Sequence, residues 1–177
     1  MTEFDFESLI ADIPDYPKPG VLFKDITPLL ADPEGFEAVV QALADPYRSL
    51  GVTKVMGAEA RGFMLGAPVA LELGCGFVPA RKPGKLPREV VEQDYDLEYG
   101  TATLQIHTDA FGPGDKVLIV DDLVATGGTM VAQVKLVEQL GAELVGIGCL
   151  MELEFFHPRD ILAPVTDKQL HSLVKVK

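Results

Sequence analysis

The sequence predicts a single α/β domain with a central, mainly parallel β-sheet flanked by helices. Strand-like and helix-like segments alternate along the chain after residue 32. The strand-like segments, such as VLIV at 117–120, are almost continuously apolar, as is typical of strands covered on both faces. A length of 177 residues suits one domain with a substantial core. We divide this domain into a cover segment at about 1–32 and a core at about 33–177.

The first half of the chain begins with a proline-rich segment. The prolines and the glycine of residues 14–20 exclude a long helix and predict an extended, turning cover. Asp32 is then expected to be the N-cap of a helix that starts at Pro33, runs toward residue 50 and is disturbed by Pro46. The elements expected next are a strand at 52–58, a helix at 62–73 and a strand at 76–80.

The second half begins with a segment that has no clear period. Residues 81–94 contain Pro83, Gly84 and Pro87, so we expect a loop there. Alternating residues at 95–107 predict a β-arm. The remaining expected elements are a strand at 116–121, an amphipathic helix at 129–140 closed by Gly141, a buried strand at 142–153 and an edge strand at 171–176.

Charge and composition exclude several classes of protein. The net charge of −12 argues against nucleic acid or an anionic membrane as a partner, since both are bound through basic surfaces. The apolar run at 62–80 has the length of a membrane span, but Glu72 and its prolines and glycines indicate a buried core segment. Cys75 and Cys149 are isolated and have no metal-binding spacing. The acidic N-terminus lacks the features of a signal peptide, so we expect a cytoplasmic protein.

The stretch VLIVDDLVATGGTM at 117–130 joins a buried strand, two carboxylates and a loop of small residues that opens a helix. Ligands of parallel sheets bind at the carboxyl ends of strands, where Asp121 and Asp122 fall. The loop consists of Ala125, Thr126, Gly127, Gly128 and Thr129. Its glycines are expected to let the backbone N–H groups of a helix N-terminus approach an anion, and its threonines add donors. The pattern predicts a phosphate cradle beside carboxylates that suit ribose hydroxyls or a divalent cation, and an ordinary capped turn is the alternative.

This stretch resembles the phosphoribosyl pyrophosphate motif of the type I phosphoribosyltransferases. Further segments are similar to the adenine-specific members of that family, and together they cover most of residues 13–153. These segments are IPDYPKPGVLFKDITPLL (13–30), GAEARGF (57–63), RKPGKLP (81–87) and DLEYGTATLQIH (96–107). The resemblance implies the type I fold with an N-terminal hood, a mobile loop and β-arm over the active site, and assembly as a homodimer.

The resemblance also implies which residues hold the pyrophosphate. Arg61 follows the first core strand, and its guanidinium can bind phosphate oxygens with two parallel hydrogen bonds. Arg81, Lys82 and Lys85 are implied to approach the pyrophosphate from a loop that closes on the site. A solvated surface cation is the alternative for each of these residues, and it is the interpretation that we favour for Arg88.

For the base, the resemblance implies a pocket under the hood. Phe23 is expected to stack on the purine, backbone groups of Leu22 and Lys24 to read its edge, and Leu153 to pack on its other side. Glu98 is implied to be the catalytic carboxylate that meets the base. Family members often have arginine where this chain has Lys24, so the resemblance supports a backbone contact at that position and no guanidinium stacking.

The implied reaction transfers the phosphoribosyl group of 5-phosphoribosyl 1-pyrophosphate to adenine, giving AMP and pyrophosphate. Mg²⁺ is implied as cofactor, held mainly through the substrate, with Asp121 or Asp122 as candidates for contact through water. Two alternatives are open: another purine, such as hypoxanthine or guanine, as acceptor, and a non-catalytic sensor of phosphoribosyl pyrophosphate that regulates a partner. Glu98, the basic loop and the acidic net charge argue against the sensor.

Overall fold

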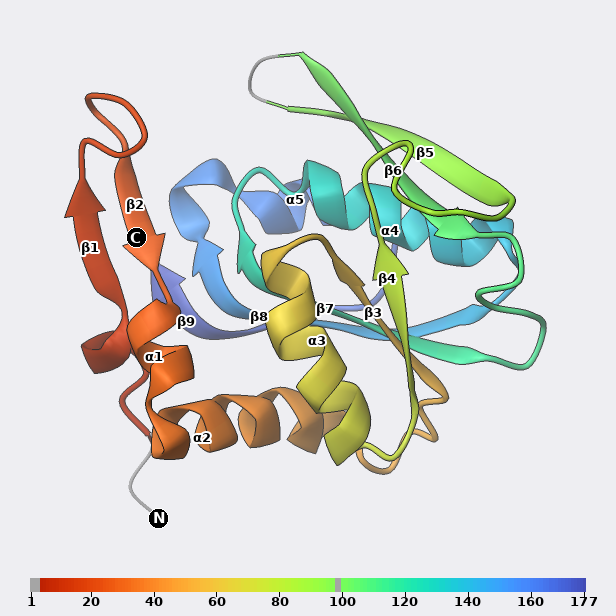
Figure 1. Cartoon of the computed structure of the whole chain (residues 1–177), viewed down its shortest axis with the longest axis horizontal. Helices are drawn as coiled ribbons and strands as arrows, with labels where there is room; N and C mark the ends of the chain where they lie inside the picture. The colour runs from red at the N-terminus through yellow and green to blue at the C-terminus, as the bar shows by residue number, and fades with distance from the viewer. Residues whose placement is uncertain (1–3, 98–99) are drawn as a thin grey trace.

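The computed structural model describes residues 4–97 and 100–177, and in this part of the chain five parallel strands form the central sheet. Their order across the sheet is β4–β3–β7–β8–β9, which confirms the predicted α/β class (Figure 1). The strands are β3 (Lys54–Ala58), β4 (Gly76–Ala80), β7 (Lys116–Val124), β8 (Glu143–Leu153) and β9 (Leu170–Val176). Because all five run the same way, their carboxyl ends lie at one edge of the sheet.

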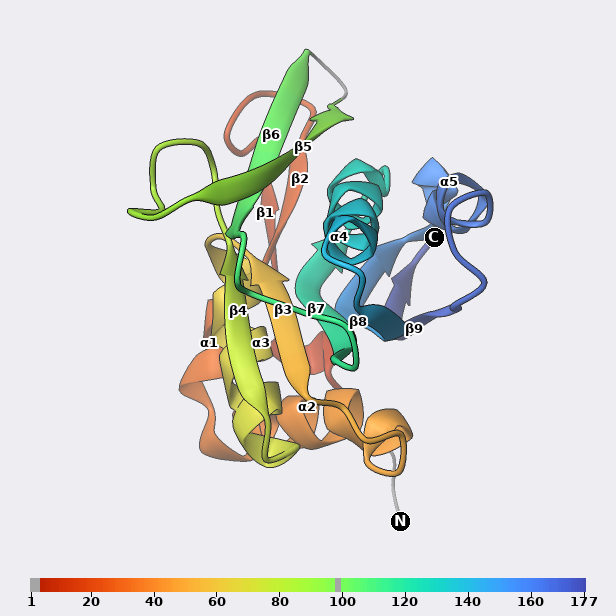
Figure 2. The same ribbon diagram turned by 90° about the vertical axis from the view of Figure 1, so that its right-hand side faces the viewer.

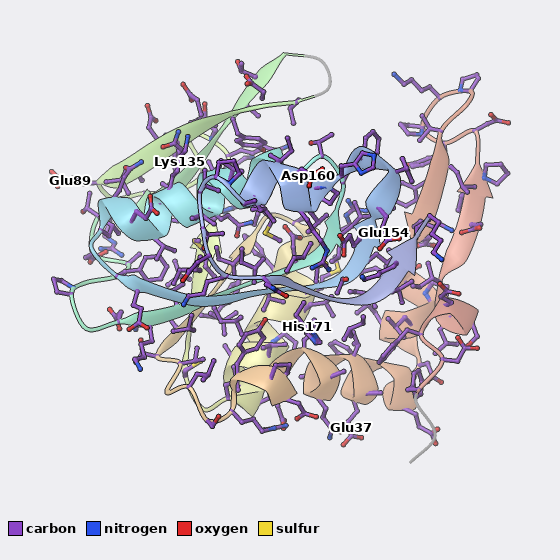
Figure 3. All side chains as sticks on the ribbon, turned by 180° about the vertical axis from the view of Figure 1, so that it is seen from behind. Glu37, Glu89, Lys135, Glu154, Asp160 and His171 are labelled. Atoms are coloured by element: carbon purple, nitrogen blue, oxygen red, sulfur yellow. The ribbon has the colours of Figure 1, made fainter. Side chains whose placement is uncertain are left out.

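Helices cover both faces of the sheet. Seen from behind, α2 (Pro33–Ala44), marked by Glu37, lies on one side, and α4 (Gly128–Gln139), marked by Lys135, lies on the other (Figure 3). The remaining helices are α1 (Thr27–Ala31), α3 (Arg61–Glu72) and α5 (Pro158–Leu162). Asp32 caps α2 as predicted, because its carboxylate accepts a hydrogen bond from the Gly35 backbone N–H at 2.7 Å.

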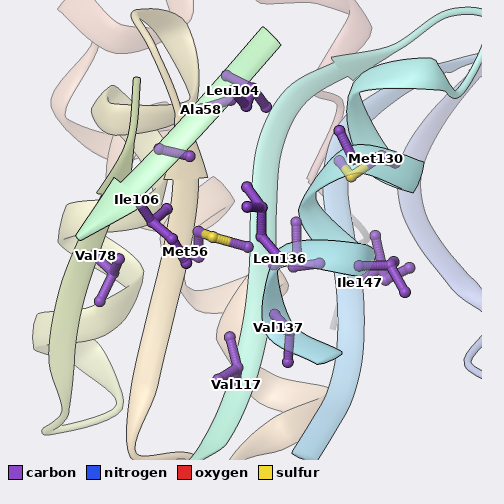
Figure 4. Close-up of a cluster of buried hydrophobic side chains, with 14 of the residues drawn as sticks. Met56, Ala58, Val78, Leu104, Ile106, Val117, Met130, Leu136, Val137 and Ile147 are labelled. Atoms are coloured by element: carbon purple, nitrogen blue, oxygen red, sulfur yellow. The ribbon is translucent and has the colours of Figure 1, made fainter. Parts of the chain in front are cut away.

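Two apolar layers hold these helices on the sheet. On the α4 side, Met56, Leu136 and Ile147 are fully buried in one cluster, which Figure 4 shows between α4 and the strands. On the opposite side, Leu43 of α2 and Leu65 of α3 are fully buried against the other face of the strands. The central strands are therefore covered on both faces, which explains their continuous apolar sequences.

Two antiparallel hairpins flank the sheet. The cover segment forms β1 (Ala11–Pro14) and β2 (Leu22–Asp25), which confirms its extended, turning character over these residues. The end of the segment differs, because residues 27–31 form the short helix α1. The arm consists of β5 (Val90–Asp96) and β6 (Thr101–His107), and Figure 2 shows it above the end of the sheet at which β3 and β4 finish. The prediction of a loop over all of 81–94 is wrong, because residues 90–94 pair with β6.

Other differences are small. β7 extends to Val124 rather than ending at 121, β3 begins at residue 54 rather than 52, and the five-residue α5 was not predicted. Within the described residues, no helix is long and apolar enough to cross a membrane.

Candidate active site

A cavity of about 400 Å³ lies at the carboxyl ends of β3 and β7, beside the β5–β6 arm. Its walls include Arg61, Lys82 and the whole run 121–129, which contains the two predicted acids and the five residues of the predicted cradle. Residues from three separate segments of the sequence therefore meet at one site. Tyr95 and Phe156 also line the cavity, and no motif in the sequence indicated either of them.

The predicted cradle forms the N-terminus of α4. Gly127 is the N-cap residue, with a left-handed backbone (φ 92°) that suits glycine, and no described side chain caps the helix. The N–H groups of the first helical turn are therefore available to an anion, and the helix dipole favours negative charge there.

The two glycines also leave room for neighbouring protein atoms. A Cβ on Gly127 would lie 3.4 Å from the Pro158 carbonyl oxygen and 3.5 Å from the Ile161 side chain. A Cβ on Gly128 would lie 2.6 Å from the carbonyl oxygen of Asp96. The cradle is thus packed between α5 and the end of β5, and the lack of side chains allows both contacts.

The two adjacent acids are buried in different surroundings. The Asp121 carboxylate accepts a hydrogen bond from the Asp122 backbone N–H at 2.9 Å and lies against the start of α3, where a Cβ on Gly62 would be 3.0 Å from its oxygen. Burial, with a further contribution from the charge of Asp122, raises the pKa of Asp121 well above its ordinary value.

Asp122 is only 2% exposed and pairs with Arg61. Its Oδ2 lies 3.1 Å from Arg61 Nε, yet this oxygen accepts no well-aligned hydrogen bond from any residue that the structure describes. Buried carboxylate oxygens normally have hydrogen-bond partners. The oxygen therefore fits a ligand hydroxyl or a hydrated cation in the neighbouring cavity.

Arg61 lies between this cavity and a second one of about 410 Å³, because it lines both. The second cavity is bounded by the β1–β2 hairpin and α3, and Phe23, Lys24 and Met64 contribute to its wall. The guanidinium carbon of Arg61 is 5.4 Å from the centroid of the Phe23 ring, within the range of a cation–π contact. In this conformation Arg61 covers a face of Phe23, the residue that was predicted to stack on the base.

Glu59 fixes the start of the basic loop, a role that the sequence did not suggest. Its Oε1 accepts a hydrogen bond from the Lys82 backbone N–H at 2.7 Å and lies 3.4 Å from Arg81 Nε. Glu59 also lines the first cavity, whereas Arg81 does not. The Glu59–Ala60 peptide bond is cis. Glu59 therefore connects the end of β3 with the segment that follows β4.

The predicted base-binding residues are more dispersed. Leu22 is exposed on β2, and Lys24 forms an ion pair with Asp12 on the opposite strand at 2.5 Å. Leu153 is the half-buried last residue of β8 and lines neither of the two cavities.

Two cations of the basic segment do not line the first cavity. Lys85 is exposed and is not among the residues that line the first cavity. Arg88 forms an exposed ion pair with Asp109 at 2.5 Å, in agreement with its interpretation as a surface cation. Glu98 lies outside the residues that the structure describes.

The fold and this site define a phosphoribosyltransferase. The family model described as "Phosphoribosyl transferase domain" matches residues 26–168, and the chain belongs to this family. The expected type I fold and the resemblance seen in the motifs are thereby confirmed.

Within the family, the similarity is to adenine phosphoribosyltransferases. The enzyme of that name from Vibrio cholerae serotype O1 is 62% identical over 138 residues, which cover 78% of this chain and 76% of that protein. A crystal structure of the enzyme from Thermoanaerobacter pseudethanolicus has a TM-score of 0.91 and 48% identity, covering 96% of this chain and 97% of that one. The Saccharomyces cerevisiae enzyme, in complex with an imino-altritol bisphosphate and adenine, has a TM-score of 0.87 and 36% identity, covering 95% and 96%.

Proposed function

We infer that this chain is an enzyme that transfers the phosphoribosyl group of 5-phosphoribosyl 1-pyrophosphate to adenine, giving AMP and pyrophosphate. The observation that carries this conclusion is the meeting of the α4 cradle, the two acids and Arg61 in one cavity, in a chain similar to adenine phosphoribosyltransferases over most of its length. The close similarity to adenine enzymes favours adenine over hypoxanthine or guanine as acceptor.

The proposed placement of the substrate follows the chemistry of the cavity wall. The 5-phosphate binds at the cradle, where Thr126 and Thr129 add hydroxyl donors to the backbone N–H groups of α4. The ribose hydroxyls bind at Asp121 and Asp122, whose carboxylates accept hydrogen bonds. Arg61 swings from Phe23 toward the pyrophosphate, since it already borders the cavity that holds the other substrate groups.

Further contacts are proposed for the remaining predicted residues. Lys82, with Arg81 and Lys85 on the same loop, adds positive charge beside the pyrophosphate. The base binds toward the second cavity, in contact with Phe23 and the backbone of Leu22 and Lys24. Leu153 packs on the base from the other side.

The chain's part in the chemistry is to hold the reactants in line and to stabilise charge. The bond from C1 of the ribose to the pyrophosphate breaks as N9 of adenine attacks, so negative charge grows on the leaving group and positive charge on the purine. Arg61 and the basic loop stabilise the first charge. Glu98 accepts the proton that leaves the purine at N7. Closure of the loop excludes water from C1.

Mg²⁺ is the proposed cofactor, and when bound with the substrate it supplies charge neutralisation at the pyrophosphate. Within residues 4–97 and 100–177, no group of three or more His, Cys, Asp or Glu side chains is placed to hold a metal ion. The residues fit an ion that the substrate brings with it, because Oδ2 of Asp122 accepts no hydrogen bond from the described residues and can accept one from the water shell of the ion.

We also propose a homodimer in the cytoplasm. Leu71 of α3 is 82% exposed, and a second copy of the chain would cover this apolar side chain. Cys75 and Cys149 are both free thiols, which suits a reducing compartment.

The hood and the core are proposed to act as one domain, because Phe6 and Ile26 of the cover segment are buried in the core cluster of α2 and α3.

The test is incubation of the protein with Mg²⁺, phosphoribosyl pyrophosphate and a purine, followed by chromatographic detection of the nucleotide. AMP formation from adenine, well above nucleotide formation from hypoxanthine or guanine, is the expected result. A Thr126→Val, Thr129→Val double variant should lose activity because two hydroxyl donors to the 5-phosphate are removed. If the wild-type protein bound phosphoribosyl pyrophosphate in calorimetry but formed no nucleotide from any purine, the sensor alternative would replace this proposal.

A further inference from the structure

Glu152 lies at the end of β8 and is held by residues from two other elements. Its carboxylate is 1% exposed and receives two hydrogen bonds from the Arg159 guanidinium of α5, Nε to Oε1 at 2.8 Å and Nη2 to Oε2 at 2.7 Å. The Ser172 hydroxyl of β9 donates to Oε2 at 2.7 Å. The paired hydrogen bonds of an arginine and a carboxylate fix direction as well as distance. The cluster therefore sets the orientation of α5 relative to the sheet.

The Glu152–Arg159 pair closes a short loop that reaches the proposed active site. Between the two residues the chain makes a 3-10 turn at Glu154–Phe156, and His157 has a left-handed backbone with φ 53°. Phe156 lines the cavity that holds the cradle and the acids. Neither the one-turn segment nor the five-residue α5 is long enough to be a stable helix by itself. The position of Phe156 thus depends on how the loop is anchored.

The other end of the same segment supports the cradle. A Cβ on Gly127 would lie 3.4 Å from the Pro158 carbonyl oxygen and 3.5 Å from the Ile161 side chain. Gly127 is the N-cap of α4, so α5 packs directly against the proposed phosphate site. One segment of the chain therefore contacts the wall of the cavity through Phe156 and the phosphate cradle through α5.

We propose that Glu152, Arg159 and Ser172 are positioning residues for phosphoribosyl transfer, which hold residues 153–161 so that Phe156 borders the cavity and α5 supports the cradle. This inference rests on the proposed function of the site. The Glu152 side chain is 2% exposed and that of Arg159 is 40% exposed. Such a half-exposed ion pair adds little stability compared with well-packed apolar side chains, so stability alone gives no reason for a charged cluster at this position. Its directional hydrogen bonds place a segment that borders the cavity through Phe156 and packs against the cradle through α5.

The test separates positioning from stability. Arg159→Met leaves a buried carboxylate without its partner, whereas the double variant Glu152→Met, Arg159→Met replaces both charges by apolar side chains of similar length. The double variant should unfold at a temperature close to that of the wild type, since neither charge is left unpaired. Its kcat/KM for adenine should nevertheless fall about 10- to 100-fold, the range expected when catalytic geometry is misplaced by roughly 1 Å. Its amides at 154–157 should exchange hydrogen faster.

Arg48→Met is the matched control. Arg48 forms ion pairs with Asp45 at 2.7 Å and Glu72 at 2.6 Å and is not among the residues that line the active-site cavity. Its loss should leave kcat/KM and exchange at 154–157 unchanged. A double variant with wild-type kcat/KM would overturn the proposal. The turnover of the wild-type protein tests the proposed function separately. If the wild type shows no turnover, the affinity of the same variants for AMP, measured by calorimetry, still tests the positioning role. An unchanged AMP affinity in the double variant would overturn that role.

Discussion

Gly127→Ala tests both the cradle and its unusual backbone. Gly127 has φ 92°, where an added Cβ costs about 1–2 kcal/mol in a left-handed conformation. The new atom would also contact the Pro158 carbonyl oxygen at 3.4 Å, which is tight but does not require a large displacement. For a domain of this size each kcal/mol lowers Tm by about 2–4 °C, so we expect Tm to fall by about 2–8 °C.

The same substitution should also weaken the binding of AMP. A loop that relaxes to relieve the strained residue turns backbone N–H groups away from the phosphate. Loss of one hydrogen bond to a charged group costs about 1.5–3 kcal/mol, which is roughly a 10- to 100-fold weaker affinity for AMP. Calorimetric titration with AMP and a thermal unfolding scan of the same preparation measure the two effects.

Gly114→Ala provides a control for strain alone. Gly114 has φ 94°, nearly the same as Gly127, but a Cβ there would find no described atom within 4 Å, and the residue does not line the cavity. This variant should lose a similar amount of stability and keep its affinity for AMP. Equal AMP affinity in the two variants would show that the phosphate does not bind at the loop 125–129.

Three further predictions address charged groups of the site. Arg61→Ala should weaken binding of phosphoribosyl pyrophosphate by roughly 10- to 100-fold and that of AMP much less, because AMP has no pyrophosphate to contact; equal weakening of both ligands in calorimetry would remove the pyrophosphate role. Glu98→Gln should lower single-turnover rates by about 10²–10⁴-fold while phosphoribosyl pyrophosphate still binds, and near wild-type rates in both directions would contradict its role as proton acceptor. Because burial and Asp122 raise the folded-state pKa of Asp121, its contribution to stability is present below an unfolded pKa of about 3.9 and is lost as pH rises through the folded pKa. Asp121→Asn should therefore unfold at a higher temperature than the wild type at pH 8 and lose that advantage near pH 3, and a less stable variant at pH 8 would refute this assignment.

The parts of the molecule that could be predicted from sequence are those encoded in contiguous residues. The apolar run before Asp121 predicts β7, and the small residues that follow the two acids predict the start of α4. The cradle can therefore be predicted from one continuous segment of the sequence. The first five residues of β5 were missed, because EQD at 92–94 follows two prolines and has the polar composition of a loop. Its strand character comes from pairing with β6 and from the packing of Tyr95 on the core, both of which require the fold.

Contacts between distant segments were likewise not predictable. Glu59 meets the Lys82 backbone, and Glu152 meets Ser172, across elements that become neighbours only through the order of strands in the sheet. No spacing in the sequence links such partners. The resemblance to a known family is the source of the roles proposed for single residues, such as Glu98 and Leu153, that the local pattern leaves unassigned.

The position of Arg61 between the two cavities has a consequence for inhibitor design. A purine fragment that stacks on the face of Phe23 covered by Arg61 would have to displace the guanidinium, and this displacement would reduce its apparent affinity when it binds alone. In the proposed movement of Arg61, a fragment with a pyrophosphate mimic in the other cavity would draw the same guanidinium away from the ring. The same movement of Arg61 is needed for both fragments to bind. A compound that joins the two fragments should therefore bind more tightly than the sum of their separate binding free energies predicts.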